Sequence, residues 1–532
     1  MRVLFRLLGG SLLIAVLLSL LGAQPPTYDL LIRGGRIVDG TGGSWWRGDV
    51  AVRGDTIAAI GKLGNASARH VIEANDLIVA PGFIDIHSHS MGILESPSAE
   101  NAVREGVTTV IDGNDGSSPL PFQPFFDKLT QARIAINFGL FVGQGTVRGR
   151  VLGNVDRKAT PDEIEKMRAL VKQAMEDGAF GLSTGLFYVP GNYTPTDEVI
   201  ELAKVAGQMG GMHISHMRNE ATDILKSIAE TIAIGERGGL PTQVSHHKII
   251  GKGNWGKSVE TLKMINEARA RGVDVSIDQY PYTASSTGLA ALLPQWAQEG
   301  TPAEVLKRLN DPPTRAKIKA AIVENLKFDR GGGDTKNVVI AACGWDRNLE
   351  GKSLADITRA RGGSASFEDA AETALEIIAK GGASAIYHAI NEDDVARIMQ
   401  EPLTMVASDG GVVMFKRGAP HPRNYGTFAR VLGVYAREKN VLRLEEAVRK
   451  MSSLPASRLK LMDRGLLRVG MKADIVVFDA ARVKDRATFA EPHQYAEGFH
   501  YVVVNGSVAL DNGKMTDVRA GQVLRGTAAR RP

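Results

Sequence analysis

Two histidines, His87 and His89, stand two positions apart at the end of an apolar run in PGFIDIHSHS, residues 81–90. In a β-strand, side chains at positions i and i+2 point to the same face, so both imidazoles would face one way. Imidazole is a common metal ligand, and two on one face can hold a single ion. The other interpretation is a pair of polar residues in a turn, and this short pattern alone does not decide between them.

Four more possible metal ligands stand where predicted strands end. In chain order they are Asp115, His216, His246 and Asp409. In a barrel of parallel strands, the carboxyl ends of all strands meet at one face, where catalytic groups sit. Imidazole and carboxylate ligands gathered at that face predict a zinc site that keeps one position open for water.

Such a site predicts a hydrolytic reaction. Bound zinc lowers the pKa of water towards neutrality and polarises a carbonyl group. Asp409 beside that water can take its proton as a general base and later pass it to a leaving amine. On its own, the sequence SDG at 408–410 is typical of an ordinary turn, but its place at the end of the last strand favours the catalytic interpretation.

The elements that would position these residues alternate between strands and helices. One helix is predicted at 161–178, where proline and acidic residues open the segment and glycine closes it. Strand–helix units recur about every 30 residues, which implies a parallel sheet. Counted from PGFIDIH, seven strands precede Tyr282 and an eighth fits at 402–410, so we expect a (β/α)8 barrel rather than an open doubly wound sheet.

Other parts of the chain predict additions to this barrel. Residues 28–80 show period-two alternation with glycine and aspartate turns, as short strands do. ADIVVFD, HYVVVNGSVAL and a DNG turn repeat this style near the C-terminus. The stretch 288–385 is too long for one connection, and it predicts a subdomain inserted before the last barrel strand.

The composition is that of an ordinary globular protein. The 532 residues are 43% apolar and 23% charged, enough for a large core and more than one domain. The formal charge of +5 is small, and no run of lysine and arginine suggests a nucleic-acid partner. The single cysteine, Cys343, excludes an internal disulfide.

Residues 1–23 are typical of a secretory signal peptide. Arg2 and Arg6 precede an apolar stretch that ends in the small-residue cleavage pattern Leu21-Gly22-Ala23. We therefore expect an exported protein, periplasmic or secreted, with no stable membrane span after cleavage. An uncleaved membrane anchor is the alternative, although the apolar stretch is short for a full span.

Several motifs together resemble one known family. They are PGFIDIHSH, GLSTGLFYVPGNY, HMRNE, SHHK, SDGG and HPRNYGTFARVLG. Between about residues 28 and 525 the chain looks like the D-aminoacylase (N-acyl-D-amino-acid deacylase) family of the amidohydrolase superfamily. The HxH pair is shared across that superfamily, whereas HMRNE with SHHK and HPRNYGTF is much more specific.

The resemblance implies a fold and an activity. The fold is a metal-dependent (β/α)8 TIM barrel over 81–463, with a small β-sandwich domain made by both chain ends, 28–80 and 464–525. The activity is hydrolysis of the amide bond of N-acyl-D-amino acids, a small-molecule substrate, to a D-amino acid and a carboxylate. One or two zinc ions would be the cofactor.

The resemblance also implies roles for individual residues. His216 of HMRNE and His246 of SHHK would bind zinc, while His87 and His89 would line a second, weaker metal position. Asp409 would be the catalytic acid and base, and would also face the metal.

Four further residues would bind the substrate's α-carboxylate. Arg423 of HPRNYG would grip it, since a guanidinium fork matches a carboxylate in two parallel hydrogen bonds. Lys248, Tyr188 and Ser285 would assist around the same group. In the plainer interpretation, Arg423 belongs to a surface ion pair and Tyr188 to the core.

Asp115 departs from the family pattern, which usually has cysteine there, in GNCG rather than GNDG. A thiolate is a soft ligand and a carboxylate a hard one, so the number and identity of the metal ions stay open. FGLSTG, residues 180–185, has no lysine to bridge two metals, which argues against the cyclic-amidase branch.

Two alternatives to the deacylase remain. One is a dipeptidase or cyclic-amide hydrolase on the same scaffold. The other is a non-catalytic binding protein that kept the barrel and lost the chemistry. Such a protein should have lost ligands, yet the histidines and Asp409 are all present.

Overall fold

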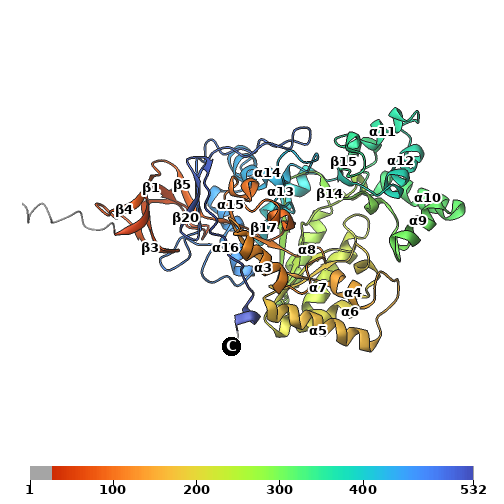
Figure 1. Ribbon diagram of the computed structural model, residues 1–532, viewed down its shortest axis with the longest axis horizontal. Coiled ribbons are helices and arrows are strands. Elements are labelled where there is room, and N and C mark those ends of the chain that lie inside the picture. The colour runs from red at the N-terminus through yellow and green to blue at the C-terminus, as the bar shows by residue number, and fades with distance from the viewer. Residues whose placement is uncertain (1–26, 531–532) are drawn as a thin grey trace, which may run out of the picture.

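Parallel strands form the barrel at the centre of the computed structural model, which describes residues 27–530 (Figure 1). One sheet has the order β17–β13–β12–β11–β10–β9, and a second has the order β6–β7–β8. Since only Phe141 separates β8 from β9, the two sheets continue one another. The strands are β6 (Phe83–Asp85), β7 (Val107–Asp112), β8 (Asn137–Leu140), β9 (Val142–Gly143), β10 (Gly181–Gly185), β11 (Met212–His216), β12 (Thr242–Val244), β13 (Val275–Gln279) and β17 (Thr404–Val406).

The barrel closes where the first and last strands end. The backbone N–H of Asp409 donates to the carbonyl of His87 at 2.9 Å, and that of His89 donates to the carbonyl of Gly410 at 2.5 Å. These bonds join the segment after β6 to the segment after β17. The (β/α)8 barrel expected from the strand count is confirmed, and its closure places the HxH pair directly beside Asp409.

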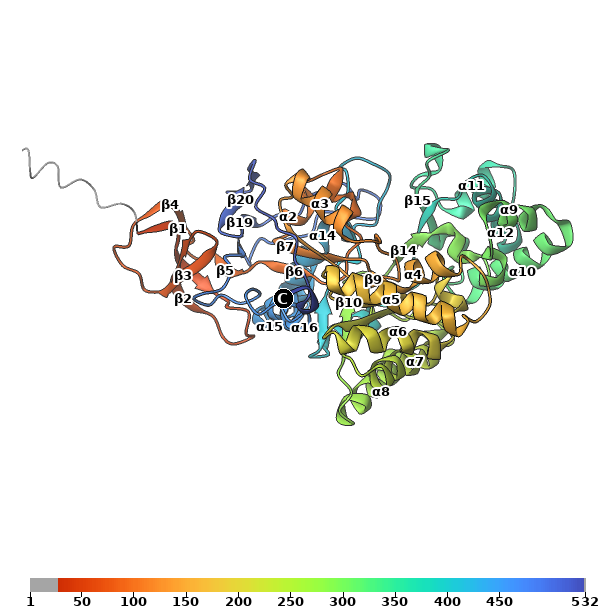
Figure 2. The same cartoon turned by 60° about the horizontal axis from the view of Figure 1, so that its bottom comes forward.

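Helices cover the outside of the barrel, and Figure 2 shows α5, α6, α7 and α8 along one flank. The outer helices are α5 (Pro161–Asp177), α6 (Thr196–Gln208), α7 (Ile224–Gly238), α8 (Ser258–Ala270), α13 (Glu392–Gln400), α14 (Arg423–Arg430) and α15 (Leu444–Met451). Helix α5 opens in a capping box, in which Thr160 and Glu163 satisfy each other's backbone N–H groups. Gly178, with a φ of 118°, ends it, as the sequence predicts.

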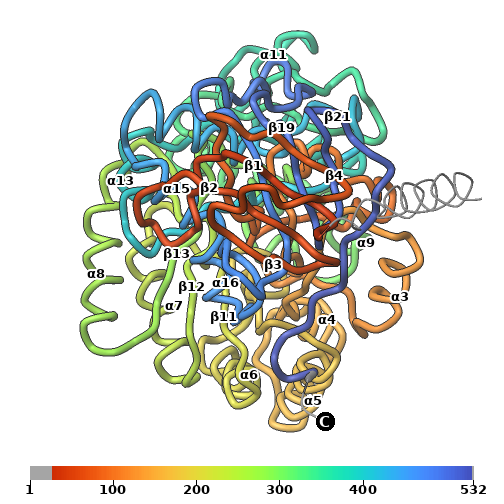
Figure 3. The backbone as a smooth tube through the Cα atoms, turned by 90° about the vertical axis from the view of Figure 1, so that its left-hand side faces the viewer, coloured from red at the N-terminus to blue at the C-terminus, as the bar shows by residue number. Residues whose placement is uncertain are grey.

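Both chain ends build one β domain. Its nine-stranded sheet has the order β21–β20–β19–β18–β5–β1–β2–β3, with β4 beside β1. The strands are β1 (Tyr28–Ile37), β2 (Trp46–Arg53), β3 (Thr56–Gly61), β4 (Ala68–Glu73), β5 (Ile78–Pro81), β18 (Ile475–Phe478), β19 (Phe499–Val504), β20 (Ser507–Asp511) and β21 (Lys514–Met515). Strand β5 pairs antiparallel with β18, and Figure 3 shows N-terminal strands in red beside C-terminal strands in blue.

The residues from β14 to β16, 285–387, form a separate body at the opposite end of the molecule from the β domain (Figure 1). It contains an antiparallel sheet of β14 (Ser285–Gly288), β16 (Ser384–Tyr387) and β15 (Val338–Ala342), with helices α9 (Pro302–Asn310), α10 (Pro312–Phe328), α11 (Leu354–Ala360) and α12 (Phe367–Ala379). Its apolar residues form their own core, against which Phe187 of the barrel packs. We call this segment the insertion.

The predicted signal peptide, residues 1–23, lies outside the described residues. Between residues 27 and 530, no helix combines the length and the apolar character needed to cross a bilayer. Cys343 is buried as a free thiol.

Candidate metal centre and active site

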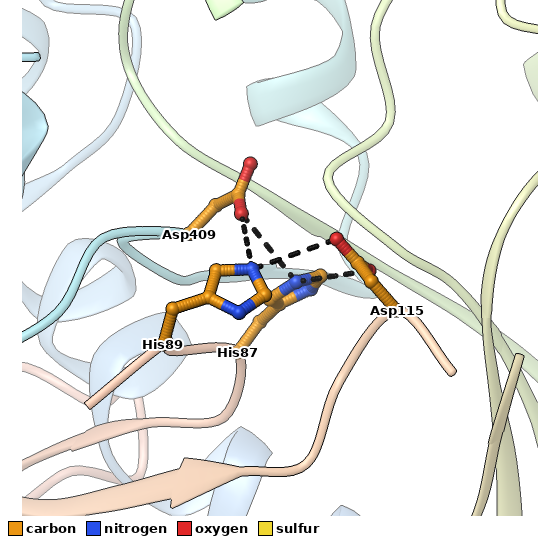
Figure 4. A group of neighbouring side chains, drawn as sticks. All are labelled: His87, His89, Asp115 and Asp409. Carbon is orange, nitrogen blue, oxygen red and sulfur yellow. Dashed lines mark hydrogen bonds and ion pairs between the residues drawn. The ribbon is translucent and has the colours of Figure 1, made fainter. Parts of the chain in front are cut away.

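A first group of four side chains gathers at the carboxyl end of the barrel (Figure 4). His87 and His89 follow β6, Asp115 follows β7, and Asp409 follows β17. His87 Nε2 lies 3.3 Å from Asp115 Oδ1 and 3.6 Å from Asp409 Oδ1. His89 Nε2 lies 3.5 Å from Asp115 Oδ2 and 3.1 Å from Asp409 Oδ1. The two imidazoles therefore face the two carboxylates across one small space.

A second group shares Asp115 with the first. His216, the last residue of β11, places Nδ1 3.3 Å from Asp115 Oδ2. His246 places Nε2 3.5 Å from Asp115 Oδ1 and 2.7 Å from His216 Nδ1. Within each group the possible ligand atoms lie within 4.8 Å of one another. Asp115 thus faces both groups, as a carboxylate between two metal positions would.

Several of these ligand atoms have no hydrogen-bond partner among the described residues, as expected for atoms that bind a metal ion. His87 Nε2 and Asp115 Oδ1 are buried and make no hydrogen bond within the described part of the chain. Buried polar atoms normally find partners, so atoms left over around a common space indicate a ligand that supplies them. Nitrogen and carboxylate oxygen donors suit zinc and related divalent ions.

Three of the site residues have unusual backbone angles. Asp115, His246 and Asp409 have φ values of 54°, 33° and 48°, in the left-handed region that residues with a side chain rarely adopt. Such angles cost energy and concentrate at functional sites. The sequence PTQVSHHK, residues 241–248, is typical of a strand, but His246 lies two residues beyond β12, because a positive φ interrupts the extended backbone.

Two buried carboxylates orient the histidines from behind. Asp278 Oδ1 lies 3.3 Å from His87 Nδ1, and Glu220 Oε1 lies 3.1 Å from His246 Nδ1. Glu220 Oε2 also lies 3.6 Å from His216 Nε2. A carboxylate on the far nitrogen fixes the tautomer of a metal-binding imidazole.

The sequence interpretation did not assign roles to Glu220 or Asp278. Glu220 closes the HMRNE motif four residues after His216, and Asp278 lies in the strand β13. The rule that found the ligands, polar residues near the carboxyl ends of strands, could have found Asp278.

Burial and neighbouring charges set the ionisation of the ligands. Burial lowers the pKa of His216 to about 4, which leaves this imidazole neutral, the form that binds metal. Burial raises the pKa of Asp409, but Arg423 and the nearby histidines outweigh it and hold that pKa below its ordinary value. The pKa of Asp115 is also low, because His87, His246 and His216 outweigh its burial. Both carboxylates are therefore ionised at neutral pH.

A cavity of about 510 Å³ opens onto both groups. Most of the predicted site residues line it: His89, Asp115, Tyr188, His216, His246, Lys248, Ser285 and Asp409. The hydroxyl of Tyr188 lies 3.0 Å from Thr287 Oγ1, and Lys248 Nζ lies 2.7 Å from His246 Nδ1. Ser285 Oγ is buried and has no hydrogen-bond partner among residues 27–530. His87 lies deeper and is fully buried.

Arg423 lies behind the cavity wall rather than on it. Its Nη1 donates to Asp409 Oδ2 at 2.7 Å, and its Nη2 donates to the carbonyl of Ser286 at 3.3 Å. The guanidinium stacks on Tyr280 and is only 5% exposed, so it is no surface ion pair. This contact stabilises the charge of Asp409 and fixes the orientation of its carboxylate.

His247, between two site residues, points elsewhere. Its Nε2 lies 2.8 Å from Thr261 Oγ1 in α8.

Comparison with known proteins gives consistent matches. The model of the Amidohydrolase family matches residues 70–510. The chain is 37% identical over 534 aligned residues to D-aminoacylase of Alcaligenes xylosoxydans xylosoxydans, covering 95% of this chain and 99% of that one. It is 38% identical over 524 residues to N-acyl-D-glutamate deacylase of the same organism, covering 94% and 97%.

A solved structure is also similar along nearly the whole chain. It is N-acyl-D-glutamate deacylase from Bordetella bronchiseptica, complexed with zinc and a phosphonate inhibitor that mimics the tetrahedral intermediate. The TM-score is 0.80 at 36% identity, covering 94% of this chain and 100% of that one.

Proposed function

The chain belongs to the amidohydrolase family, and from that membership we propose that it is a zinc-dependent hydrolase of the amide bond in N-acyl-D-amino acids. The products are a D-amino acid and a carboxylate. One observation carries the proposal: two groups of metal ligands share Asp115 beside the ionised Asp409, and both open onto one cavity.

The two donor sets support two metal positions. His216, His246 and Asp115 would hold one zinc ion, and His87, His89, Asp115 and Asp409 would hold a second. When bound, zinc polarises the amide carbonyl and makes water a better nucleophile at neutral pH.

Asp409 moves the proton. Its Oδ2 accepts a hydrogen bond from Arg423, so the proton from the attacking water would go to Oδ1, which faces His89 and is available when the second metal position is empty. The same oxygen then returns the proton to the nitrogen of the leaving amino acid. Because Arg423 fixes the carboxylate, Asp409 needs no rearrangement between the two transfers.

The substrate's α-carboxylate would be bound by three other residues that line the cavity. Lys248 supplies a positive charge, and the hydroxyls of Tyr188 and Ser285 supply neutral donors. We propose that Arg423 also contributes, through N–H groups that Asp409 and Ser286 leave free.

Stereospecific assay tests the proposed function. The zinc-loaded enzyme should hydrolyse N-acetyl-D-amino acids and leave the L-enantiomers intact. Dipeptides and cyclic amides such as hydantoins should not be cleaved. Turnover of those substrates, with none on N-acetyl-D-amino acids, would refute the proposal.

Arg423 gives a sharper test. If it contacts the α-carboxylate, Arg423→Ala should lower kcat/KM for N-acyl-D-amino acids more than for the corresponding α-amides, which lack that charge. Charged hydrogen bonds are worth about 1.5–3 kcal/mol, so we expect a difference of about 10- to 100-fold between the two substrate classes. Equal losses would mean that Arg423 acts through Asp409 alone.

We propose that the protein is exported, on the basis of the positive start, apolar stretch and cleavage pattern of residues 1–23. Mass spectrometry of the mature protein should then find a start near Gln24. Recovery of the intact Met1 form from the cytoplasm would contradict export.

A further inference from the structure

One cation in the cavity comes from the insertion. Arg330 follows helix α10 and is 3% exposed, yet it lines the same cavity as the metal ligands. Its guanidinium lies 4.0 Å above the ring of Phe187, the barrel residue on which the insertion packs. None of the reaction steps described above uses it.

The guanidinium is poorly satisfied by its own chain. Arg330 Nη2 lies 3.5 Å from Glu220 Oε2, a long contact. Its Nε is buried and has no hydrogen-bond partner in the part of the chain that the structure describes. A guanidinium has five N–H donors, and burying a charge without matching acceptors is costly. An anion entering the cavity would remove that cost.

The loop that presents Arg330 is tightly fixed. The backbone N–H of Arg330 donates to the side chain of Asn325, and the backbone N–H of the next residue, Gly331, donates to the carbonyl of Asn325. A side chain at Gly331 would meet the backbone of Leu326 at 2.3 Å, so only glycine fits there. The arginine is therefore held in place before any ligand binds, which lowers the entropy lost on binding.

On the cavity wall beside Arg330, two cations face one carboxylate. Glu220 lies between two cations, with Oε1 bonded to Lys248 and Oε2 towards Arg330. Lys248 and Arg330 both line the cavity here, with Glu220 as the carboxylate between them, whereas Asp329, which also interacts with Arg330, does not line it. A substrate that carries a single carboxylate would satisfy Lys248 and leave Arg330 with only its long contact to Glu220.

The position of Arg330 indicates where the second anion lies. Lys248 and Arg330 contact opposite oxygens of one carboxylate, so they are neighbours, and anions that they bind must also be close together. The α-carboxylate and the side-chain carboxylate of an acidic amino acid are separated by only two or three carbons. The acyl group is attached on the other side of the α-carbon, through the amide.

We propose that Arg330 binds the side-chain carboxylate of the substrate, so that the enzyme prefers N-acyl derivatives of acidic D-amino acids. This inference rests on the proposed function and names its substrate class. Arg330 acts by direct contact with substrate, as a bidentate partner of a carboxylate.

Isosteric substrates test the proposal in the zinc-loaded enzyme. N-acetyl-D-glutamate and N-acetyl-D-aspartate are compared with N-acetyl-D-glutamine and N-acetyl-D-asparagine, which have nearly the same shape without the charge. The wild type should show higher kcat/KM for the acids, and Arg330→Gln should reduce that acid-to-amide ratio by about 10- to 100-fold. Arg330→Lys keeps the charge without the fork, so it should retain part of the preference.

Arg361→Gln is the matched control, since Arg361 belongs to the same insertion, pairs with Glu376 at 2.8 Å and does not line the cavity. It should leave the ratio unchanged. An unchanged ratio in Arg330→Gln, or a wild type that prefers the neutral amides, overturns the proposal. The proposal is also overturned if the enzyme prefers a negative charge on the acyl group rather than on the side chain, as efficient hydrolysis of N-succinyl-D-leucine would show.

A binding measurement separates this proposal from the proposed function. Calorimetry with D-glutamate and D-glutamine, the expected products, needs no turnover. If no N-acetyl-D-amino acid is hydrolysed, the proposed function fails, and Arg330 is still judged by whether D-glutamate binds more tightly and whether Arg330→Gln removes the difference. If Arg330→Gln does not fold, the partial retention expected for Arg330→Lys decides.

Discussion

Asp409→Asn should lower kcat by about 10²–10⁴-fold, the usual contribution of a positioned proton-transfer group. Asparagine keeps the shape of aspartate, and its amide oxygen can still accept the hydrogen bond from Arg423. It cannot take a proton at neutral pH. The fold and most of the bound metal should therefore persist while turnover is lost, and steady-state kinetics with metal analysis would measure both.

Asp485→Asn is a close control for this variant. Asp485 also pairs with an arginine, Arg430, and its side chain is 8% exposed, as is that of Asp409. It lies outside the metal cavity, so its variant should keep wild-type kcat. Near-wild-type kcat in Asp409→Asn would remove Asp409 from the proton-transfer step.

Asp115→Ala should abolish most metal retention and, with it, activity. Asp115 is the member that both ligand groups share, so this single change removes a ligand from each. Loss of an outer partner typically costs 10–100-fold in metal affinity, and loss of a shared ligand should exceed about 100-fold. Bound metal per chain, measured after matched dialysis, tests this directly, with the exposed Asp197→Ala as control.

The family's usual residue provides the complementary variant. Asp115→Cys should bind metal and raise the selectivity for zinc over manganese, because a thiolate is softer than a carboxylate. Full metal content and turnover in Asp115→Ala would show that Asp115 is only a turn residue and that the histidines and Asp409 hold the metal alone.

The barrel could be predicted because each unit carries local signals. Proline, acidic residues and glycine marked α5 to within one residue at its end. Strand lengths were less predictable. The apolar segment RIAINFGLFVG, residues 133–143, is typical of one long strand, but only β8 and β9 are extended in it, because pairing with β7 begins at Asn137 opposite Thr109. A strand's length depends on its neighbour, which the local sequence does not contain.

The site residues also fall into those that the local sequence predicts and those that it does not. Ligands such as His216 follow from their place at a strand end, and the structure brings all of them together. Glu220 and Arg330 have no such signal. Glu220 is placed by the loop after β11, and Arg330 reaches the cavity only because the insertion folds back over Phe187. Long-range docking of this kind leaves no periodic pattern in the sequence.

The pairing of β5 with β18 has a consequence for how the chain acquires its structure. Strand β5 ends at Pro81 and its partner begins at Ile475, so nearly the whole barrel is synthesised between them. Until the C-terminal strands emerge, the N-terminal strands present an unpaired edge, which is where premature association between chains begins. Closing such a long loop also slows assembly. The nine-stranded sheet can therefore be completed only after the barrel strands have been synthesised, and a chain that is cut short near its C-terminus would leave strand β5 without its partner β18.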